Sequence, residues 1–203
     1  AAAAVEATLR SDDGNESLAL GAALGALGVA GRDKVVIADA GSGIVGFGDW
    51  AEQLIAESTG KSGRGLLPVV VEGTDAPGFT ETADSHLVTL GTTPPPDGTA
   101  VSGPLGGQFL AWEFATAVAG KLLDIDPFNQ PNVQESKDNT KAVLEAAGDG
   151  DLPIGTPAFV DGPVEVYGEP KDLGGATDLA GVLDVLLASV PANGYLAVMA
   201  YLD

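Results

Sequence analysis

Segments with helical character alternate with short apolar runs of strand length along this chain of 203 residues. Such alternation favours a parallel sheet flanked by helices, because a crossover helix returns the chain to the start of the next parallel strand. The predicted strands are residues 34–38, 66–71, 86–90, 99–103 and 195–202. The predicted helices are residues 17–30, 50–59, 109–123, 134–147 and 176–190, and a hairpin is predicted at 159–166.

Chain length and local composition refine this α/β prediction. The length is ample for one α/β domain with a substantial core. Glycine and alanine dominate residues 17–30, which predicts a helix that packs closely on a neighbour. Helix 109–123 is apolar nearly all round, so Glu113 within it is predicted to be buried, with a structural role. His86 is predicted to begin a strand and is not favoured as a catalytic histidine.

The charge and the rare residue types exclude several classes of function. The formal net charge is −20, from 29 acidic and 9 basic residues. Binding to nucleic acid or to an anionic membrane is therefore not expected, because both depend on Lys and Arg. Cysteine is absent, which excludes disulfides, thiolate metal sites and a cysteine nucleophile. A single histidine excludes a multi-histidine metal site.

No segment has the pattern of a signal peptide or a membrane-spanning helix. The most apolar run, Leu18 to Ala30, is about thirteen residues long, whereas a helix needs roughly twenty to cross a bilayer. Acidic residues precede this run, where a signal peptide would carry positive charge. A cytoplasmic location is therefore expected.

The segment from Asp124 to Lys137 is the most informative about function. An Asp-Pro-Phe turn leaves the apolar helix and is predicted to project Gln130 outward. Pro131 suits the first turn of a second helix, where a missing N–H costs nothing. Lys137 then falls on the same side as Gln130. An amide and an ammonium presented together suit a polyhydroxylated or phosphorylated small molecule, although spacing alone favours a polar helix start with a solvated lysine.

Three blocks of sequence resemble glucose-6-phosphate isomerases. The first comprises Trp112-Glu-Phe-Ala-Thr-Ala-Val-Ala-Gly-Lys-Leu-Leu123, then Phe128-Asn-Gln130, Val133 and Lys137. The second is residues 47–61, which end in Glu57-Ser-Thr-Gly-Lys61, and the third is residues 20–34, close to actinobacterial versions. Asn132 departs from the family pattern, which usually has a small residue there. Asparagine tolerates positive φ, so the turn can survive this change.

This resemblance implies a fold and a place in a larger enzyme. Residues 1–203 resemble the second sugar-isomerase (SIS) domain, a three-layer sandwich with a five-stranded parallel sheet. The family has a first SIS domain before this region and further residues after it. The chain is therefore expected to be a fragment of a two-SIS-domain isomerase and inactive alone. Its expected partners are a sugar-phosphate substrate, the first SIS domain and a possible second subunit.

The implied reaction is the interconversion of glucose 6-phosphate and fructose 6-phosphate without a metal or other cofactor. Glu57 matches the family's proton-transfer base. A carboxylate beside the apolar stripe of Trp50, Leu54 and Ser58, in the last turn of a helix, is expected to have a raised pKa. Spacing alone favours a surface glutamate at a helix end, and the resemblance reverses that preference. The resemblance also assigns Lys137 to ring opening and oxyanion stabilisation, and Gln130 to substrate binding.

A glycine-rich loop gives a second candidate segment. Gly41-Ser-Gly-Ile-Val-Gly46 follows a predicted strand, and Glu72 ends the next one, as in a dinucleotide-binding fingerprint. Asp39 would repel a pyrophosphate, and Phe47-Gly-Asp49 delays the predicted helix. A flexible loop lining the sugar site is therefore favoured, with Gly41 and Ser42 as substrate-binding residues.

Two alternatives remain open at this point. The same domain occurs in bifunctional transaldolase–isomerases, whose isomerase half carries very similar blocks. A non-catalytic SIS module that binds sugar phosphates is the other alternative. The presence of Glu57 together with Lys137 argues against it, because a sensor needs no proton shuttle.

Overall fold

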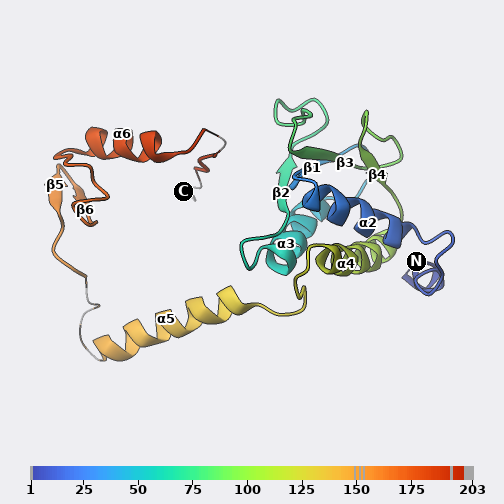
Figure 1. Cartoon of the computed structure of the whole chain (residues 1–203), viewed down its shortest axis with the longest axis horizontal. Coiled ribbons are helices and arrows are strands. Elements are labelled where there is room, and N and C mark those ends of the chain that lie inside the picture. The colour runs from blue at the N-terminus through green and yellow to red at the C-terminus, as the bar shows by residue number, and fades with distance from the viewer. Residues whose placement is uncertain (1, 149, 151, 153, 193, 199–203) are drawn as a thin grey trace. The chain divides into compact units, whose positions relative to one another are not determined.

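The computed structural model describes residues 2–148, 150, 152, 154–192 and 194–198 (Figure 1). The chain divides into two compact units, Ala1–Asp138 and Asn139–Asp203. Among the described residues, no helix combines the length and apolarity that crossing a bilayer requires.

The first unit is built on a four-stranded parallel sheet. Its strands are β1 (Lys34–Asp39), β2 (Leu67–Val71), β3 (Ser85–Leu90) and β4 (Thr99–Val101), in the order β2-β1-β3-β4. In the register of the sheet, Val36 of β1 lies opposite Val69 of β2 and Leu87 of β3. The parallel α/β prediction is confirmed, with four strands in place of five. Residues 195–198 of the predicted fifth strand are not in a strand, and 199–202 lie outside the described residues.

Four helices of the first unit are α1 (Ala2–Glu6), α2 (Glu16–Val29), α3 (Phe47–Thr59) and α4 (Leu105–Leu122). Asn15 caps α2, because its Oδ1 accepts a hydrogen bond from the Leu18 N–H at 2.9 Å. Helix α3 begins earlier than predicted. Gly46 at its N-cap has φ +76°, which turns the chain directly into the helix and buries Phe47 in the core.

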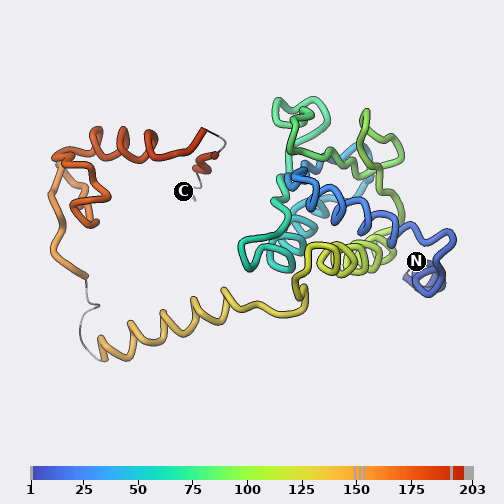
Figure 2. Tube along the Cα trace, viewed as in Figure 1, coloured from blue at the N-terminus to red at the C-terminus, as the bar shows by residue number. Residues whose placement is uncertain are grey.

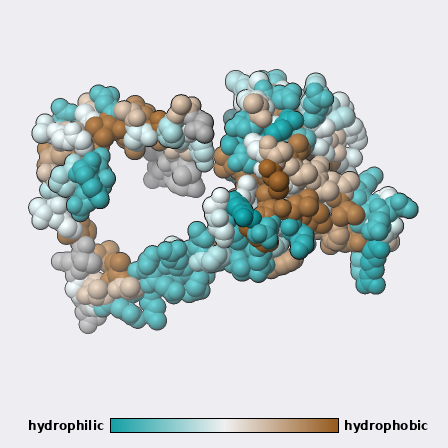
Figure 3. Space-filling view, in the orientation of Figure 1, coloured by the Kyte–Doolittle hydropathy of each residue, from teal (hydrophilic) through white to brown (hydrophobic). Residues whose placement is uncertain are grey.

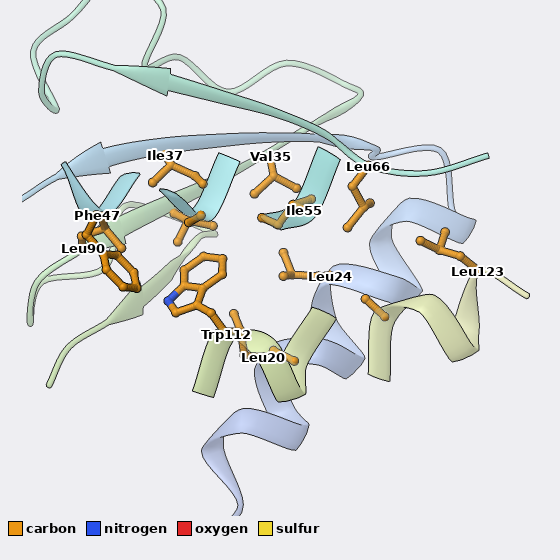
Figure 4. Close-up of a cluster of buried hydrophobic side chains, with 14 residues drawn as sticks. Leu20, Leu24, Val35, Ile37, Phe47, Ile55, Leu66, Leu90, Trp112 and Leu123 are labelled. Atoms are coloured by element: carbon orange, nitrogen blue, oxygen red, sulfur yellow. The ribbon is translucent and has the colours of Figure 1, made fainter. Parts of the chain in front are cut away.

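Helices α2, α3 and α4 share one hydrophobic core with the sheet (Figure 4). Val35 and Ile37 of β1 point from the sheet toward these helices, and the Trp112 side chain of α4, fully buried, points back toward the sheet. The Phe47 and Trp112 rings are 6.4 Å apart in an edge-on arrangement. All three helices therefore cover the same face of the sheet. In the described part of this unit, the third layer of the predicted sandwich is not seen.

Close packing of α2 on α4 rests on glycines, as the sequence predicts. The two helices lie side by side in the Cα trace (Figure 2). A Cβ atom added to Gly21 would lie 2.4 Å from the main-chain oxygen of Ala115. One added to Gly25 would lie 2.8 Å from the Leu122 Cβ. These distances are below van der Waals contact, so only glycine permits this approach of the two helices.

Glu113 is exposed on α4, so the prediction that it is buried is wrong. The buried face of α4 carries Trp112, Ala115, Thr116 and Ala119. Glu113 lies 100° around the helix from Trp112 and falls outside that face. A helix that is apolar nearly all round can still have an open face.

The division between the units falls within the residues of helix α5 (Pro131–Ala147), none of which is buried. The second unit contains the strands β5 (Phe159–Asp161) and β6 (Val164–Val166), which form the predicted antiparallel hairpin, and α6 (Leu179–Ser189). Asp178 caps α6 by accepting a hydrogen bond from the Gly181 N–H at 2.7 Å. Leu183, Leu186 and Leu187 of α6 are exposed, and hydrophobic residues are visible on this helix in Figure 3.

His86 lies at the start of β3, as predicted, with 5% of its surface exposed. Its Nε2 is 2.9 Å from the Thr99 Oγ1 of the neighbouring strand β4. Burial lowers the pKa of His86, and the positive charge of Arg32 lowers that pKa further. A buried imidazole that pairs with a strand neighbour fits a structural role.

A lowered pKa of His86 predicts a loss of stability in mild acid. Below pH about 6.5 the unfolded chain binds a proton at this side chain before the folded chain does. The free energy of unfolding should therefore fall as pH drops from 7, until the folded-state pKa is passed. His86→Gln keeps a hydrogen-bonding group but does not titrate. Urea unfolding of both proteins between pH 7 and 5.5 should show a smaller fall in the variant, and parallel curves would contradict this assignment.

Candidate functional site

Two segments far apart in the sequence meet where α3 and α4 end. Both helices follow strands of the parallel sheet and run back, so both end at the edge where the strands begin. Residues 57–65 follow from the last turn of α3, and residues 123–130 follow α4. The first of these segments ends the sequence block 47–61, and the second contains the turn of the block that begins at Trp112.

Glu57 and Gln130 are in direct contact at this place. The Gln130 Nε2 donates a hydrogen bond of 3.2 Å to the Glu57 Oε2, across 73 positions of sequence. The other carboxylate oxygen, Oε1, accepts a hydrogen bond of 3.1 Å from the Gln53 Nε2, one helical turn earlier. Two amides thus hold both oxygens of one carboxylate, and all three side chains are exposed to solvent. Such a carboxylate is oriented and accessible to a small molecule.

The turn from Asp126 to Gln130 is ordered by its own residues. The Asp126 Oδ1 accepts the Phe128 N–H at 2.9 Å, and its Oδ2 accepts the Asn129 Nδ2 at 3.2 Å. Pro127 packs on α4 at Gly120, where an added Cβ would lie 3.0 Å from the proline ring. Helix α5 then begins at Pro131. The prediction that this turn projects Gln130 outward, ahead of a helix starting at Pro131, is confirmed.

Lys61 is the residue of this site whose role sequence reasoning missed. Only 6% of it is exposed, and its ammonium crosses to the turn that follows α4. The Nζ donates to the Asp126 main-chain oxygen at 2.9 Å, to the Asn129 main-chain oxygen, and to the Asn129 Oδ1 at 3.3 Å. A lysine just after a helix C-cap is a weak signal, because spacing does not pair it with acceptors that lie 65 positions further on.

The environment expected for Glu57 is wrong in one respect. The buried residues of α3 are Phe47, Ala51, Ile55 and Thr59, and not the stripe through Ser58. Because Phe47, Ala51, Ile55 and Thr59 face the core, Glu57 lies on the open side of the last turn. In this structure the carboxylate is therefore solvated, and the expected desolvation beside an apolar surface is not present.

Lys137 lies on α5 and is exposed. Within the described part of the chain, no hydrogen bond or ion pair joins it to Glu57 or to Gln130. It follows Pro131 by six residues, about 9 Å along the helix. Its pairing with Gln130 around a substrate therefore stays a prediction.

Gly41 and Ser42 lie at the other end of α3. The helix runs from Phe47 past Glu57, a separation of about 15 Å at 1.5 Å per residue. Gly41 has φ +85°, and the Ser42 N–H donates to the Asp39 Oδ1 at 3.0 Å. Within the first unit, the structure does not bring these two residues together with Glu57. Their role in substrate binding stays a prediction.

One argument against a dinucleotide at this loop is wrong, and the other gains support. Residues 47–49 do not delay the helix, because α3 begins at Phe47. Asp39, however, ends β1 directly before the loop, and hydrogen bonds from Ser42 hold the pKa of its carboxyl below the usual value. The carboxylates of Asp39 and Asp49 both line the pocket beside this loop. Two negative charges oppose the binding of a pyrophosphate.

Among the described residues, no cluster of three or more His, Cys, Asp or Glu side chains is placed to hold a metal ion. The arrangement at Glu57 offers instead an oriented carboxylate, amide donors and a nearby ordered turn, which suits proton transfer on a polar small molecule. Neither a protein-family model nor a curated protein sequence matches this chain.

Proposed function

We propose that this protein is an aldose–ketose isomerase that interconverts glucose 6-phosphate and fructose 6-phosphate, with Glu57 as the base. The observation that carries the proposal is the contact of 3.2 Å between Gln130 and Glu57. The resemblance assigns these two residues to one substrate site, although they stand in separate sequence blocks. Their contact in the fold supports that assignment. The proposal includes the SIS fold. A parallel sheet, four-stranded in this chain, is what the chain has in common with that fold.

The proposed chemistry is a proton transfer between neighbouring carbons. After ring opening, the Glu57 carboxylate removes the proton from C2 of the open-chain aldose, and the electron pair moves to form an enediolate. The carboxyl group then returns the proton to C1 while the C2–OH becomes the carbonyl and its proton passes to the C1 oxygen, which gives the ketose. The hydrogen bond from Gln53 orients the carboxylate during both transfers. The amide of Gln130, exposed beside it, donates to a substrate oxygen.

Lys137 is proposed to stabilise the oxyanion that develops on the substrate. Lys137→Ala should lower both turnover and the affinity for sugar phosphates, because it removes a positive charge near a dianionic substrate. Lys141→Ala is the matched control on the same helix, since Lys141 pairs with Glu145 at 3.6 Å. Its loss should change little. Steady-state kinetics of both variants decide the point. Equal effects would show a general electrostatic influence in a chain of net charge −20.

The activity itself is tested by a coupled assay on the complete protein that contains these residues. Fructose 6-phosphate is supplied, and the glucose 6-phosphate formed is measured. Turnover that is lost in the Glu57→Gln variant but persists after metal chelation supports the proposal. Binding of fructose 6-phosphate without turnover would overturn it in favour of a non-catalytic sugar-phosphate module.

A further inference from the structure

Lys61 combines deep burial with a set of entirely uncharged acceptors. A buried ammonium is costly unless its three N–H groups are satisfied. Here the main-chain oxygens of Asp126 and Asn129, with the Asn129 Oδ1, provide acceptors for them. In the described part of the chain, Lys61 forms no ion pair with a carboxylate. Its charge is therefore used to hold main-chain carbonyls in place.

The segment that carries Lys61 is itself fixed. The Thr59 Oγ1 donates to the Ile55 main-chain oxygen at 2.8 Å and accepts the Leu66 N–H at 3.0 Å. Lys61 and Arg64 exchange two main-chain hydrogen bonds, of 3.2 Å and 3.0 Å. The tight turn between them directs both side chains to the end of α4.

Arg64 supports the same junction from its outer side. Its Nη1 donates to the Leu123 main-chain oxygen at 3.0 Å and to the Asp124 Oδ2 at 3.2 Å. The Leu123 carbonyl lies at the negative end of the α4 dipole, where a cation is favoured. Arg64 is more exposed, so Lys61 is the stronger of the two restraints.

We infer that Lys61 is a positioning residue of the candidate site, which fixes the Asp126–Gln130 turn against the end of α3 and so keeps the Gln130 amide on the Glu57 carboxylate. Lys61 donates hydrogen bonds to Asp126 and Asn129, on the turn immediately before Gln130. Glu57 lies four residues before Lys61, so both partners of the Gln130–Glu57 contact are next to this restraint. The function of this arrangement rests on the proposed isomerase activity. The positioning itself does not, and it can be measured without substrate.

The substrate-free test follows the side-chain NH₂ signal of Gln130 by NMR at pH 7. In the otherwise unchanged protein, Glu57→Gln should shift this signal, because it replaces the charged acceptor. In a Lys61→Met background the same replacement should leave the signal unmoved. Lys121→Met, which removes an exposed charge from the end of α4, is the control background and should preserve the shift. A full shift in the Lys61→Met background would overturn the inference.

Lys61→Gln gives a second variant that keeps a polar donor in the buried position, should Lys61→Met not fold. In this background, the change of the Gln130 NH₂ signal caused by Glu57→Gln should be smaller, while the urea midpoint of unfolding stays close to that of the parent. If the Gln130 signal stops responding only in variants whose core signals also change, because the protein is unfolding, then positioning is not the role of Lys61.

Kinetics then separate this inference from the proposed function. Lys61→Gln should lower kcat by at least about fivefold with a smaller change in KM, and adding Gln130→Leu should lower kcat little further, because the two act through one contact. Fully additive losses in kcat would overturn the inference. If the complete protein without substitutions shows no turnover, the proposed function fails, and the NMR comparison alone decides the positioning role.

Discussion

Replacing Glu57 by glutamine is expected to lower the turnover of glucose 6-phosphate by at least ~10²-fold, the lower end of what general acid–base groups contribute. The amide keeps the size of the side chain and can still accept a hydrogen bond from Gln130 or Gln53. It cannot take up a proton, and a base is required in every turnover. Binding of fructose 6-phosphate, measured by calorimetry, should therefore stay close to that of the parent protein.

The matched control for this variant is Glu52→Gln on the same helix. Glu52 stands outside the last turn of α3, away from the contact with Gln130. Both variants lose one negative charge, so a general electrostatic effect would change them alike. Turnover by Glu57→Gln within tenfold of the parent would contradict the role of Glu57 as the base.

Replacing Gly21 by alanine is expected to destabilise the fold by about 1–3 kcal/mol, the usual cost of overpacking a core. In an ordinary helix this change gains up to ~1 kcal/mol of helix propensity. Here the new Cβ would lie 2.4 Å from the Ala115 main-chain oxygen and 2.7 Å from the Val118 Cβ. Neither can move without displacing α4, so α2 and α4 must separate.

Urea unfolding measures this loss, and Ala19→Leu is its control. Ala19 is exposed on the same helix, so a larger side chain there meets no neighbour and should change the free energy of unfolding by less than about 0.5 kcal/mol. A Gly21→Ala protein as stable as the parent would show that the two helices do not approach as closely as described.

Local sequence signals were sufficient for most of the first unit. Short runs rich in apolar residues predict β1 and β3, which are buried in the middle of the sheet, and also the edge strand β2, which is only partly buried. The glycines of residues 17–30 predict the close contact of α2 with α4. Pro131 predicts the start of α5, since proline lacks the N–H that a first helical turn does not use.

Predictions that depended on which face a residue occupies were less accurate. The apolar character of α4 predicts a buried Glu113, yet one face of this helix stays open. The predicted start of α3 at Trp50 is three residues late, because the sequence does not show that Phe47, directly after Gly46, packs into the core. The stripe expected from Trp50, Leu54 and Ser58 is also one residue off the buried series Ala51, Ile55 and Thr59, and this offset put Glu57 beside apolar groups.

The sequence by itself determined the alternation of helices and strands, the parallel sheet and the outward turn that ends at Gln130. These properties follow from periodicity and from the backbone preferences of proline and glycine, which act over a few residues. Only the tertiary structure decided that the Gln130 amide contacts the Glu57 carboxylate and that Lys61 donates a hydrogen bond to the Asp126–Gln130 turn. Those contacts join positions 65 or more apart, and their partners are set by the packing of α3 and α4 on the sheet. Spacing along the chain carries no record of that packing, because it arises only when all three elements share one core.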